Sequence, residues 1–343
     1  MKERILIVRL SAVGDVLHGL PVLNALRDAR PRAFIAWVVE GAAGQLLRDH
    51  KALDELIVVP RKWLKSPRAV FDLRRRLRAL QFDISVDLQG LTKSAVAARL
   101  SGARRRIGFD GRDGRELSRW LNNDRLSATR THVVDRNLEL LAPLGITDPI
   151  ARFDLDDTPS DARAAREILA TRRLGDRFAV INPGAGWPSK LWPAERFAGV
   201  ARYLGNRHSS RSLVVWAGEE EHAWAEQIVA SSAGFATLAP ATSLRELAAV
   251  TRHASVFVSS DTGPLHLAAA VKTPCVGLFG PMPAERNGPY GPHHIAVQKM
   301  CLIGTSRQRR TAGPESMEAI SIEHVCEACD RILKRAEGAR RTA

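Results

Sequence analysis

The chain has 343 residues, of which 51 are Lys or Arg and 37 are Asp or Glu, so its formal net charge is +14. This length allows two domains of ordinary size, each with its own core. No run of eighteen apolar residues occurs, which excludes a conventional membrane-spanning helix. The first apolar run, ILIVRL, is short and contains Arg9, unlike a signal peptide, so we expect a cytoplasmic protein.

The positive charge is concentrated in one part of the chain. Between residues 61 and 136 there are 19 basic and 8 acidic side chains. Such a cluster predicts a polyanionic partner, which could be a nucleic acid, an anionic membrane surface or a phosphorylated acceptor. The alternative is a solvated face, because 42 of the 51 basic residues are arginine.

Short apolar runs alternate with helical patterns in both halves of the chain. This order predicts an α/β protein with two doubly wound parallel sheets. The helices are clearest at 20–29 and 70–80. We expect strands at 5–10, 34–40, 56–60, 82–88 and 106–109, and again at 178–184, 212–218, 236–240, 255–261 and 275–281.

The predicted domain boundaries follow from composition. A Pro- and Asp-rich segment, 151–175, resembles a linker and includes the start of a helix near Ser160. It separates an N-terminal domain, 1–150, from a C-terminal domain, 176–322. Residues 323–343 are expected to form a final helix and a disordered tail after Ala336.

Polar residues follow several of the predicted strands. Asp15 follows the first strand, 182–190 follow the first strand of the second half, 219–221 follow the next, and Asp261 follows the fourth. Parallel strands carry their ligand loops at their carboxyl ends, so these residues predict a site in a cleft shared by the domains.

The segment SSDTGPLHLAAA has the features of an anion site. Asp261, Thr262 and Gly263 precede a helix of small residues, and a helix N-terminus offers free N–H groups and a positive dipole end. A nucleoside diphosphate is the natural ligand. The alternative is that Asp261 only caps the helix. No Walker A or G-x-G-x-x-G motif follows a strand, which argues against an ATPase or a dehydrogenase.

The four cysteines exclude a disulfide scaffold. Cys326 and Cys329 have the spacing of half a zinc site, but the other half is missing apart from Cys301 and His324. We therefore favour core thiols on a helix and expect no metal site.

Six segments in order carry a resemblance to a known family: SAVGDVLHGLP, DLQGLTKSA, GFDGRDGRE, NPGAGWPSKLWP, WAGEEEHAWA and SSDTGPLHLAAA. They resemble the glycosyltransferase family 9 heptosyltransferases over about residues 4–335. The resemblance implies a GT-B fold with two Rossmann-like domains facing a cleft, the acceptor on the first and the nucleotide sugar on the second.

The resemblance also implies the reaction. It is an inverting, metal-independent transfer of L-glycero-D-manno-heptose from ADP-heptose to the Kdo–lipid A inner core of lipopolysaccharide, with no cofactor. The D-x-D sequence at 154–156 is superficially that of a metal-dependent transferase, but it lies in the predicted linker and we interpret it as solvated.

Matching the motifs gives the expected donor site. Lys190 of KLWP would be a catalytic residue that stabilises the leaving diphosphate, and the alternative is a surface lysine at a helix start. Where enzymes that add the first heptose commonly have hydroxyl side chains, this chain has Ala185 and Gly186. The residues expected to bind the donor are Ser189, Glu221 (or its neighbour Glu220), Asp261, Thr262, Gly263 and His266.

The same matching places the acceptor site in the first domain. Asp15 would be the general base that takes the proton of the acceptor hydroxyl. Small neighbours let a sugar approach the backbone, and arginines suit phosphate and carboxylate groups. The expected acceptor-binding residues are Ser11, Gly14, His18, Arg61, Lys62, Lys65 and Arg115, with a partly buried helix histidine as the alternative for His18. The basic cluster would also hold the protein peripherally on the anionic inner face of the cytoplasmic membrane.

Two further hypotheses remain open at this stage. One is a family 9 transferase that uses another nucleotide sugar or another acceptor, such as a second-heptose transferase. The other is a non-catalytic polyanion-binding protein. Against nucleic acid as its partner stand the presence of only two tyrosines and the lack of any nucleic-acid motif.

Overall fold

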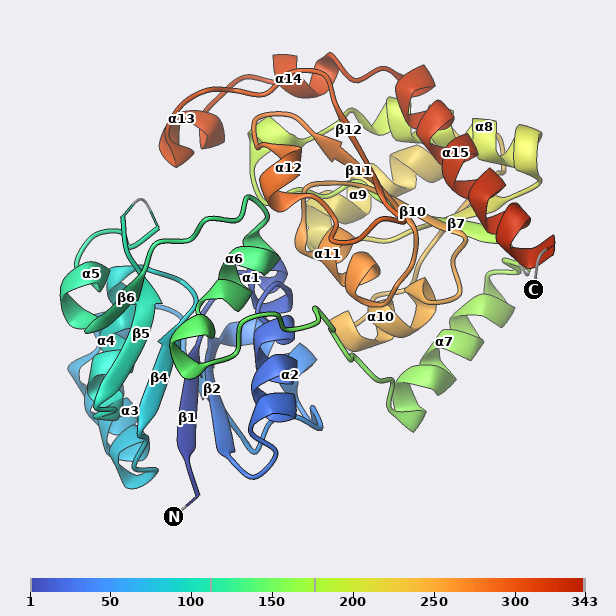
Figure 1. Ribbon diagram of the computed structural model, residues 1–343. Coiled ribbons are helices and arrows are strands. Elements are labelled where there is room, and N and C mark those ends of the chain that lie inside the picture. The colour runs from blue at the N-terminus through green and yellow to red at the C-terminus, as the bar shows by residue number, and fades with distance from the viewer. Residues whose placement is uncertain (1, 112, 176, 342–343) are drawn as a thin grey trace. The chain divides into compact units, whose positions relative to one another are not determined.

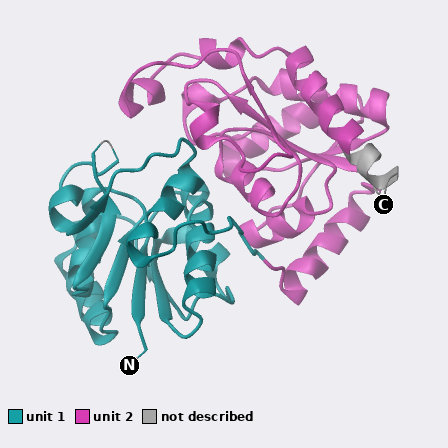
Figure 2. Ribbon diagram, viewed as in Figure 1, with its two compact units in different colours: residues 1–155 teal, residues 156–343 magenta. Residues whose placement is uncertain are grey.

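Two six-stranded, all-parallel sheets organise the chain, each with helices on both faces (Figure 1). The computed structural model describes residues 2–111, 113–175 and 177–335. The two sheets belong to separate units, Met1–Leu155 and Asp156–Ala343 (Figure 2). The predicted α/β class with two doubly wound sheets is confirmed.

The sheet of the first unit has the order β3-β2-β1-β4-β5-β6. Ile5 on the central strand is paired with Ile35 on one side and Ile84 on the other. All five expected strands are present. A sixth, β6, was not predicted because its three residues, Asp-Arg-Leu, lack an apolar run. The strands are β1 (Arg4–Val8), β2 (Phe34–Glu40), β3 (Glu55–Val59), β4 (Ile84–Asp87), β5 (Arg105–Phe109) and β6 (Asp124–Leu126).

Helices cover both faces of this sheet. Helices α3, α4 and α5 pack in sequence on one face, and α2 packs with α6 on the other. Leu6 and Val8 contribute to the core that includes Leu73 and Leu77 of α3. The helices are α1 (Val13–Leu17), α2 (Leu20–Ala29), α3 (Pro67–Ala79), α4 (Thr92–Ser101), α5 (Ser118–Leu121) and α6 (Val133–Glu139), with short 3-10 helices η1 (Gly41–Leu47), η2 (Trp63–Lys65) and η3 (Ala142–Leu144).

The sheet of the second unit has the order β12-β11-β10-β7-β8-β9. Counted within its own unit, this is the same order as in the first sheet. The five expected strands are again present, and a short edge strand was again missed. The strands are β7 (Phe178–Asn182), β8 (Arg211–Val214), β9 (Ala236–Leu238), β10 (Val256–Ser260), β11 (Cys275–Phe279) and β12 (Ile295–Gln298).

Helices α8, α9 and α15 cover one face of the second sheet, and α7, α10 and α11 pack together at the other. Cys326 and Cys329 of α15 lie in the core, where burial raises the pKa of Cys326 to about 12 and also raises that of Cys329. They are core thiols, as favoured above. The helices are α7 (Pro159–Thr171), α8 (Ala194–His208), α9 (Gly218–Ala230), α10 (Leu244–Thr251), α11 (Gly263–Ala270), α12 (Ala284–Asn287), α13 (Ser306–Arg310), α14 (Glu315–Glu318), α15 (Ile322–Arg341) and the 3-10 helix η4 (Pro188–Lys190).

The segment expected to be a linker is largely part of the second unit. Helix α7 starts at a capping box in which Thr158 and Asp161 bond each other's backbone N–H groups. Asp161 also forms an ion pair with Arg245 of α10 at 3.0 Å. Helix α7 is amphipathic and packs against α10, to which this ion pair joins it, so it does not serve as an extended linker.

The final helix expected near residue 323 is present as α15, which begins at Ile322. It packs on the second sheet and on α8. The tail expected after Ala336 lies outside the residues that the structure describes.

The strand order determines where ligand loops diverge. In each sheet, successive strands are added first toward one edge and then toward the other, so the strand order reverses between two central neighbours. These are β1 and β4 in the first unit and β7 and β10 in the second. Loops leaving the carboxyl ends of such a pair run to opposite faces and open a crevice. Asp15 follows β1 and Asp261 follows β10, so the candidate residues lie at these two positions.

Candidate functional site

Three side chains meet at the carboxyl ends of β7 and β10 in the second unit. Lys190 Nζ lies 2.5 Å from Asp261 Oδ2, and His266 Nε2 lies 3.2 Å from Asp261 Oδ1. The side chains of Lys190 and Asp261 are only 13% and 8% exposed, so the pair is held away from water. Burial by itself would raise the pKa of Asp261, but the bond with His266 and the charge of Lys190 outweigh it and lower the pKa.

Lys190 has a second contact that fixes its position. Its Nζ lies 4.4 Å from the centre of the Trp187 ring, within the range of a cation–π interaction. Trp187 is the N-cap of the short helix η4 and Lys190 is its last residue, and the Lys190 N–H donates to the Trp187 carbonyl. The lysine head is therefore placed by its loop and not left as a mobile surface charge.

The start of helix α11 is shaped by a polar network. Thr262 is its N-cap and accepts a hydrogen bond from the Leu265 N–H, so the alternative that Asp261 merely caps this helix is wrong. Asn182 Nδ2 donates to Ser259 Oγ at 2.9 Å and to Thr262 Oγ1 at 3.3 Å. This network ties the end of β7 to the end of β10.

Backbone donors remain available at this helix start. Within the described residues, the N–H groups of Thr262 and Gly263 donate no hydrogen bond to the protein. Both residues are partly exposed. They lie at the positive end of the α11 dipole beside Lys190's partner Asp261. The second unit thus presents one cation and two backbone donors, which is a suitable chemistry for a phosphate group.

Glu221 lies beside the loop that follows β7. Its Oε2 accepts a hydrogen bond from the Ala217 N–H at 2.9 Å, and a Cβ on Gly184 would approach its Oε1 to 2.2 Å. The lack of a side chain at Gly184 leaves room for the carboxylate in this position. Burial raises the pKa of Glu221, and the neighbouring Glu220 adds to the rise, despite the hydrogen bond from Ala217.

Ser189 takes a different position from the one expected. Its side chain is 1% exposed and its hydroxyl donates to the Arg309 carbonyl at 2.8 Å. In this structure the hydroxyl holds the segment of α13 and does not face an open loop. Among the expected donor residues of the second unit, the structure brings together Lys190, Asp261, Thr262, Gly263 and His266, with Glu221 against the β7 loop.

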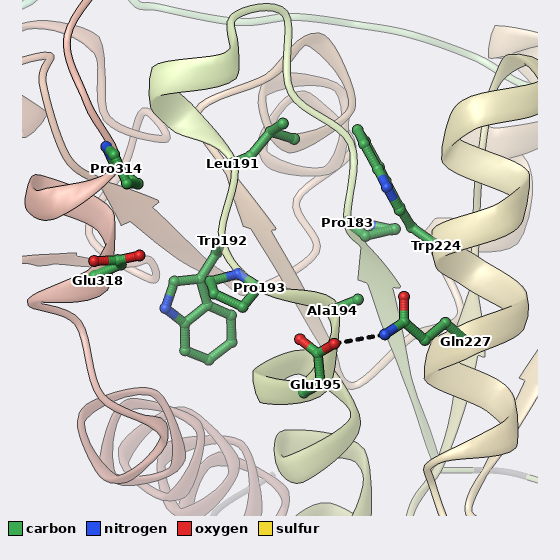
Figure 3. A pocket seen from close by; sticks show the side chains of 10 residues that line it. All are labelled: Pro183, Leu191, Trp192, Pro193, Ala194, Glu195, Trp224, Gln227, Pro314 and Glu318. Carbon is green, nitrogen blue, oxygen red and sulfur yellow. Dashed lines mark hydrogen bonds between the residues drawn. The ribbon is translucent and has the colours of Figure 1, made fainter.

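A pocket of about 310 Å³ lies beside this loop, and Pro183 and Leu191 are among the residues that line it (Figure 3). Trp192 and Trp224 contribute apolar surface to it. Its charged lining residues are Glu195 and Glu318, and Glu195 accepts a hydrogen bond from Gln227 at 2.5 Å. With carboxylates and no cation in its lining, this pocket is unsuitable for a diphosphate.

In the first unit, Asp15 lies in the loop and short helix that follow β1. Its Oδ1 is 2.6 Å from Arg9 Nη2, and its Oδ2 accepts a hydrogen bond from the Ala12 N–H at 3.1 Å. The aspartate side chain is 37% exposed, whereas that of Arg9 is 9% exposed. Arg9 and Ala12 thus hold the Asp15 carboxylate on one side, and its other side is open to solvent.

The neighbouring strand supports this arrangement. Arg9 Nη1 donates to the Leu88 carbonyl just after β4, and the Leu10 N–H donates to Gln89 Oε1 at 3.0 Å. Asp87 Oδ1 accepts from the N–H groups of Gln89 and Gly90 at 3.0 and 3.1 Å. Burial raises the pKa of Asp87, although its four hydrogen bonds oppose the rise. The loops after β1 and β4 are therefore fastened together.

A second polar chain links three of these loops. Lys93 Nζ donates to Ser11 Oγ at 2.9 Å and forms an ion pair with Glu40 at 3.0 Å. A Cβ on Gly41, the residue after Glu40, would lie 3.9 Å from Arg61 Nε. The Arg61 side chain therefore extends toward the loop after β2. The contacts of Lys93 with Glu40 and Ser11 connect that loop to the loop after β1.

The other expected acceptor residues divide by exposure. Lys62, Lys65 and Arg115 are exposed on loops after β3 and β5. His18 is 2% exposed, and its ring packs edge-on near His132 with 6.1 Å between centroids. Gly14 is buried inside α1. His18 and Gly14 thus lie in the interior of the unit, as the alternative for His18 anticipated.

Comparison with known proteins decides the family. The model of glycosyltransferase family 9 (heptosyltransferase) matches residues 70–312. The chain belongs to glycosyltransferase family 9. Lipopolysaccharide heptosyltransferase 1 of Salmonella typhimurium is 32% identical over 306 residues, which cover 85% of this chain and 93% of that protein.

Solved structures agree with the family assignment. A family 9 glycosyl transferase from Veillonella parvula is 25% identical, with a TM-score of 0.81 and 97% of each chain covered. E. coli heptosyltransferase WaaC with ADP-2-deoxy-2-fluoro heptose is 28% identical, with a TM-score of 0.75, covering 96% of this chain and 99% of that one. This family 9 chain is a glycosyltransferase, and the predicted GT-B type with two Rossmann-like units is confirmed.

Four residues at these sites were missed from the sequence: Arg9, Glu40, Lys93 and Trp187. A charge at the end of an otherwise apolar strand, as in ILIVRL, is a signal that would have pointed to Arg9. The partners of Lys93 are 53 and 82 residues away in sequence, so no local pattern reveals them.

The D-x-D sequence at 154–156 lies where the two units join in sequence. Asp154 is 3.5 Å from Arg152, so one carboxylate of the D-x-D sequence takes part in an ion pair in the first unit. Asp156 offers its carbonyl to Arg245 Nη2 at 3.1 Å. In the part of the chain that the structure describes, no cluster of three His, Cys, Asp or Glu side chains is placed to hold a metal ion.

Lys190→Met should destabilise the protein by about 3 kcal/mol at pH 7, because Asp261 would stay buried without its cation. The folded pKa of Asp261 is lowered, so its ionised form adds stability above its unfolded value of about 3.9, and this is lost as the pH falls through the folded pKa. The destabilisation should therefore shrink between pH 7 and pH 3 in urea denaturation.

The matched control is Lys299→Met, which removes an exposed lysine from the same unit and should leave stability nearly unchanged. An equal loss for Lys190→Met at both pH values would mean that packing of the lysine stem, and not the ion pair, stabilises the loop.

Proposed function

We propose that this glycosyltransferase is an inverting heptosyltransferase that moves L-glycero-D-manno-heptose from ADP-heptose to the Kdo–lipid A inner core. Family membership and the similarity to lipopolysaccharide heptosyltransferase 1 support the class of reaction. The observation that carries the proposal is the Lys190, Asp261 and His266 cluster beside the start of α11. It has the charge and the backbone donors that a sugar nucleotide requires.

In this proposal the second unit binds the donor. Lys190 and the N–H groups of Thr262 and Gly263 hold the diphosphate, and Glu221 accepts hydrogen bonds from the ribose hydroxyls. Asp261 shares its carboxylate between Lys190 and a heptose hydroxyl. Because Lys190 already contacts Trp187 and Asp261, its charge is oriented before the ligand arrives, and little reorganisation is needed in the reaction.

The first unit supplies the base. As the acceptor oxygen forms its bond to C1 of the heptose, the bond from C1 to the diphosphate oxygen breaks and ADP leaves. Asp15 takes the proton of the acceptor hydroxyl. Arg9 fixes one oxygen of Asp15 and the Ala12 N–H fixes the other, so a lone pair is directed toward the open side. Arg9 acts through Asp15 and is a positioning residue.

The acceptor of this reaction is anionic, and the exposed basic residues of the first unit suit it. Arg61, Lys62, Lys65 and Arg115 lie on loops after the carboxyl ends of strands, as Asp15 does. Guanidinium groups bind phosphate and carboxylate bidentately. We propose that the same surface makes peripheral contact with an anionic membrane. None of the described helices is long and apolar enough to cross a bilayer.

A different nucleotide sugar or a later heptose position is the alternative within the family. It is favoured by one observation, the loop before Lys190. Gly186 has open space around it, and the Ser189 hydroxyl is bonded to Arg309. Phosphate contacts from hydroxyl side chains are thus replaced by backbone donors. Membership of an enzyme family leaves the non-catalytic polyanion-binding hypothesis without support.

ADP should bind the full chain equally well in magnesium and in EDTA, because a lysine and a helix N-terminus are proposed to balance the diphosphate charge. Isothermal titration with ADP, and with UDP and GDP alongside, measures this and the preference for the base. Affinity that weakens by more than about tenfold on chelation would contradict metal-independent donor binding. Tighter binding of UDP or GDP would favour the alternative nucleotide sugar.

Asp15→Ala should lower kcat by about 10²–10⁴, the usual contribution of a positioned general base. Asp15→Asn should be almost as slow, since an amide keeps the hydrogen bond to the Ala12 N–H but accepts no proton. Donor affinity should stay the same for both variants, as Asp15 belongs to the acceptor unit.

Turnover and thermal midpoint are compared for the two Asp15 variants. An Asp15→Asn enzyme with normal activity would show that Asp15 serves only as part of the α1 capping arrangement, and the proposed base would have to be another group.

A further inference from the structure

The outward face of helix α3 carries an exposed aromatic side chain. Leu73 and Leu77 are buried in the core of the first unit, which fixes the inner face of the helix. On the opposite side Phe71 is 62% exposed. An isolated exposed phenylalanine is unfavourable in water, so its setting among the neighbouring side chains matters.

Arginines surround this phenylalanine. Residues three and four apart are neighbours on a helix surface, so Arg68, Arg74 and Arg75 flank Phe71 at positions i−3, i+3 and i+4. All three are exposed. Arg75 forms only a surface contact with Asp72 at 3.3 Å, with both side chains at least half exposed. Within the described residues, Arg68 and Arg74 have no ion-pair partner.

The arginines farther around the helix behave differently. Arg76 forms an ion pair with Glu55 at 2.6 Å, and Arg78 lies against Gly102, where an added Cβ would approach its Nη1 to 2.3 Å. The charge of Arg76 is thus paired within the fold. Arg68 and Arg74 beside Phe71 lack such a pair among the described residues, so their charges are open to a partner.

A second exposed apolar side chain lies in the segment just before the helix. Leu64 of η2 is 40% exposed, between the exposed Lys62 and Lys65. The junction is stiff, since Ser66 caps α3, its Oγ accepting from the Ala69 N–H at 3.3 Å, and Pro67 follows. Helix α3 also packs on η2. We call Leu64, Phe71, Arg68, Arg74 and Arg75 the α3 surface.

We propose that the α3 surface inserts Phe71 and Leu64 into the headgroup region of an anionic lipid bilayer, while its arginines bind lipid phosphates. A helix with one apolar anchor among basic residues is typical of interfacial membrane binding. Charge complementarity selects an anionic bilayer, because Asp72 is the single acidic residue within α3, whose sequence is PRAVFDLRRRLRA. This deepens the membrane contact of the proposed function by naming the element and the apolar insertion.

The position of the surface fits a lipid-linked acceptor. Residues 61–65 connect β3 to α3, so the basic residues proposed to bind the acceptor and the α3 surface belong to one short stretch of chain. A headgroup bound at α3 would lie near the loop that carries Arg61 and Lys65. This argument from position rests on the proposed function, because it assumes a lipid-linked acceptor. The exposure and charge of the α3 surface do not depend on that assumption.

Cosedimentation of the full chain with vesicles tests the proposal. The vesicles contain phosphatidylcholine alone or phosphatidylcholine with phosphatidylglycerol. The wild type should bind the anionic vesicles, and Phe71→Ser should weaken that binding about tenfold, whereas Phe71→Trp should retain it. Ile303→Ser, which removes an exposed apolar residue of the second unit, is the matched control and should bind as the wild type does.

Charge reversal of Arg68 and Arg74 to Glu should abolish binding to anionic vesicles. If this double variant loses binding while Phe71→Ser keeps it, the contact is purely electrostatic and insertion is overturned. Absence of wild-type binding, or stronger binding to a duplex DNA probe than to vesicles, overturns the bilayer as partner.

The readouts separate this inference from the proposed transferase activity. ADP titration of Phe71→Ser should match the wild type, because the α3 surface belongs to the acceptor unit. A wild type that binds vesicles but fails to transfer heptose would leave the membrane surface standing and refute only the proposed reaction. A protein that transfers heptose but does not bind vesicles would refute the membrane surface and leave the proposed reaction standing.

Discussion

The buried contact between Lys190 and Asp261 is the constraint on which the second unit's site depends. One residue comes from the loop after β7 and the other from the end of β10, so the ion pair closes the point where the strand order reverses. Taking two charges out of water is costly, and a buried pair is weak support for stability by itself. The pair instead keeps one cation, one carboxylate and the start of α11 in a fixed arrangement, which is what binding a charged ligand requires.

The first unit repeats this design with one difference. Arg9 bridges the carbonyl after β4 and the carboxylate of Asp15, again joining the loops of the two central strands. Here the arginine is buried and the aspartate is 37% exposed, whereas Asp261 is 8% exposed. Exposure distinguishes the two aspartates. Asp15 is open on one side, as its proposed role of general base requires, whereas Asp261 is enclosed by partners that lower its pKa.

The sequence predicted the fold well wherever apolar runs were long. Each of the ten expected strands is present, because a parallel strand buried on both faces has a continuous apolar run. The edge strands β6 and β12 were missed, since they have only three and four residues and β6 also lacks an apolar run. Helix α7 was assigned to a linker because its tertiary partner Arg245 lies 84 residues away.

From the sequence, a site residue could be predicted where a local motif identifies it. Motif residues such as Lys190 and Asp261 were identified, but their direct contact depends on the sheet order and not on local sequence. The same holds for the pairing of Arg9 with Asp15. Asp261 was the cap considered for α11 from the sequence, and the backbone geometry assigns that role to Thr262 instead.

A crystal structure of the protein with ADP tests the central claim most directly. The account predicts diphosphate density within hydrogen-bonding distance of Lys190 Nζ and of the N–H groups of Thr262 and Gly263, with the ribose at Glu221. Density for ADP with its phosphates away from α11, for example in the pocket beside Trp224, would contradict it.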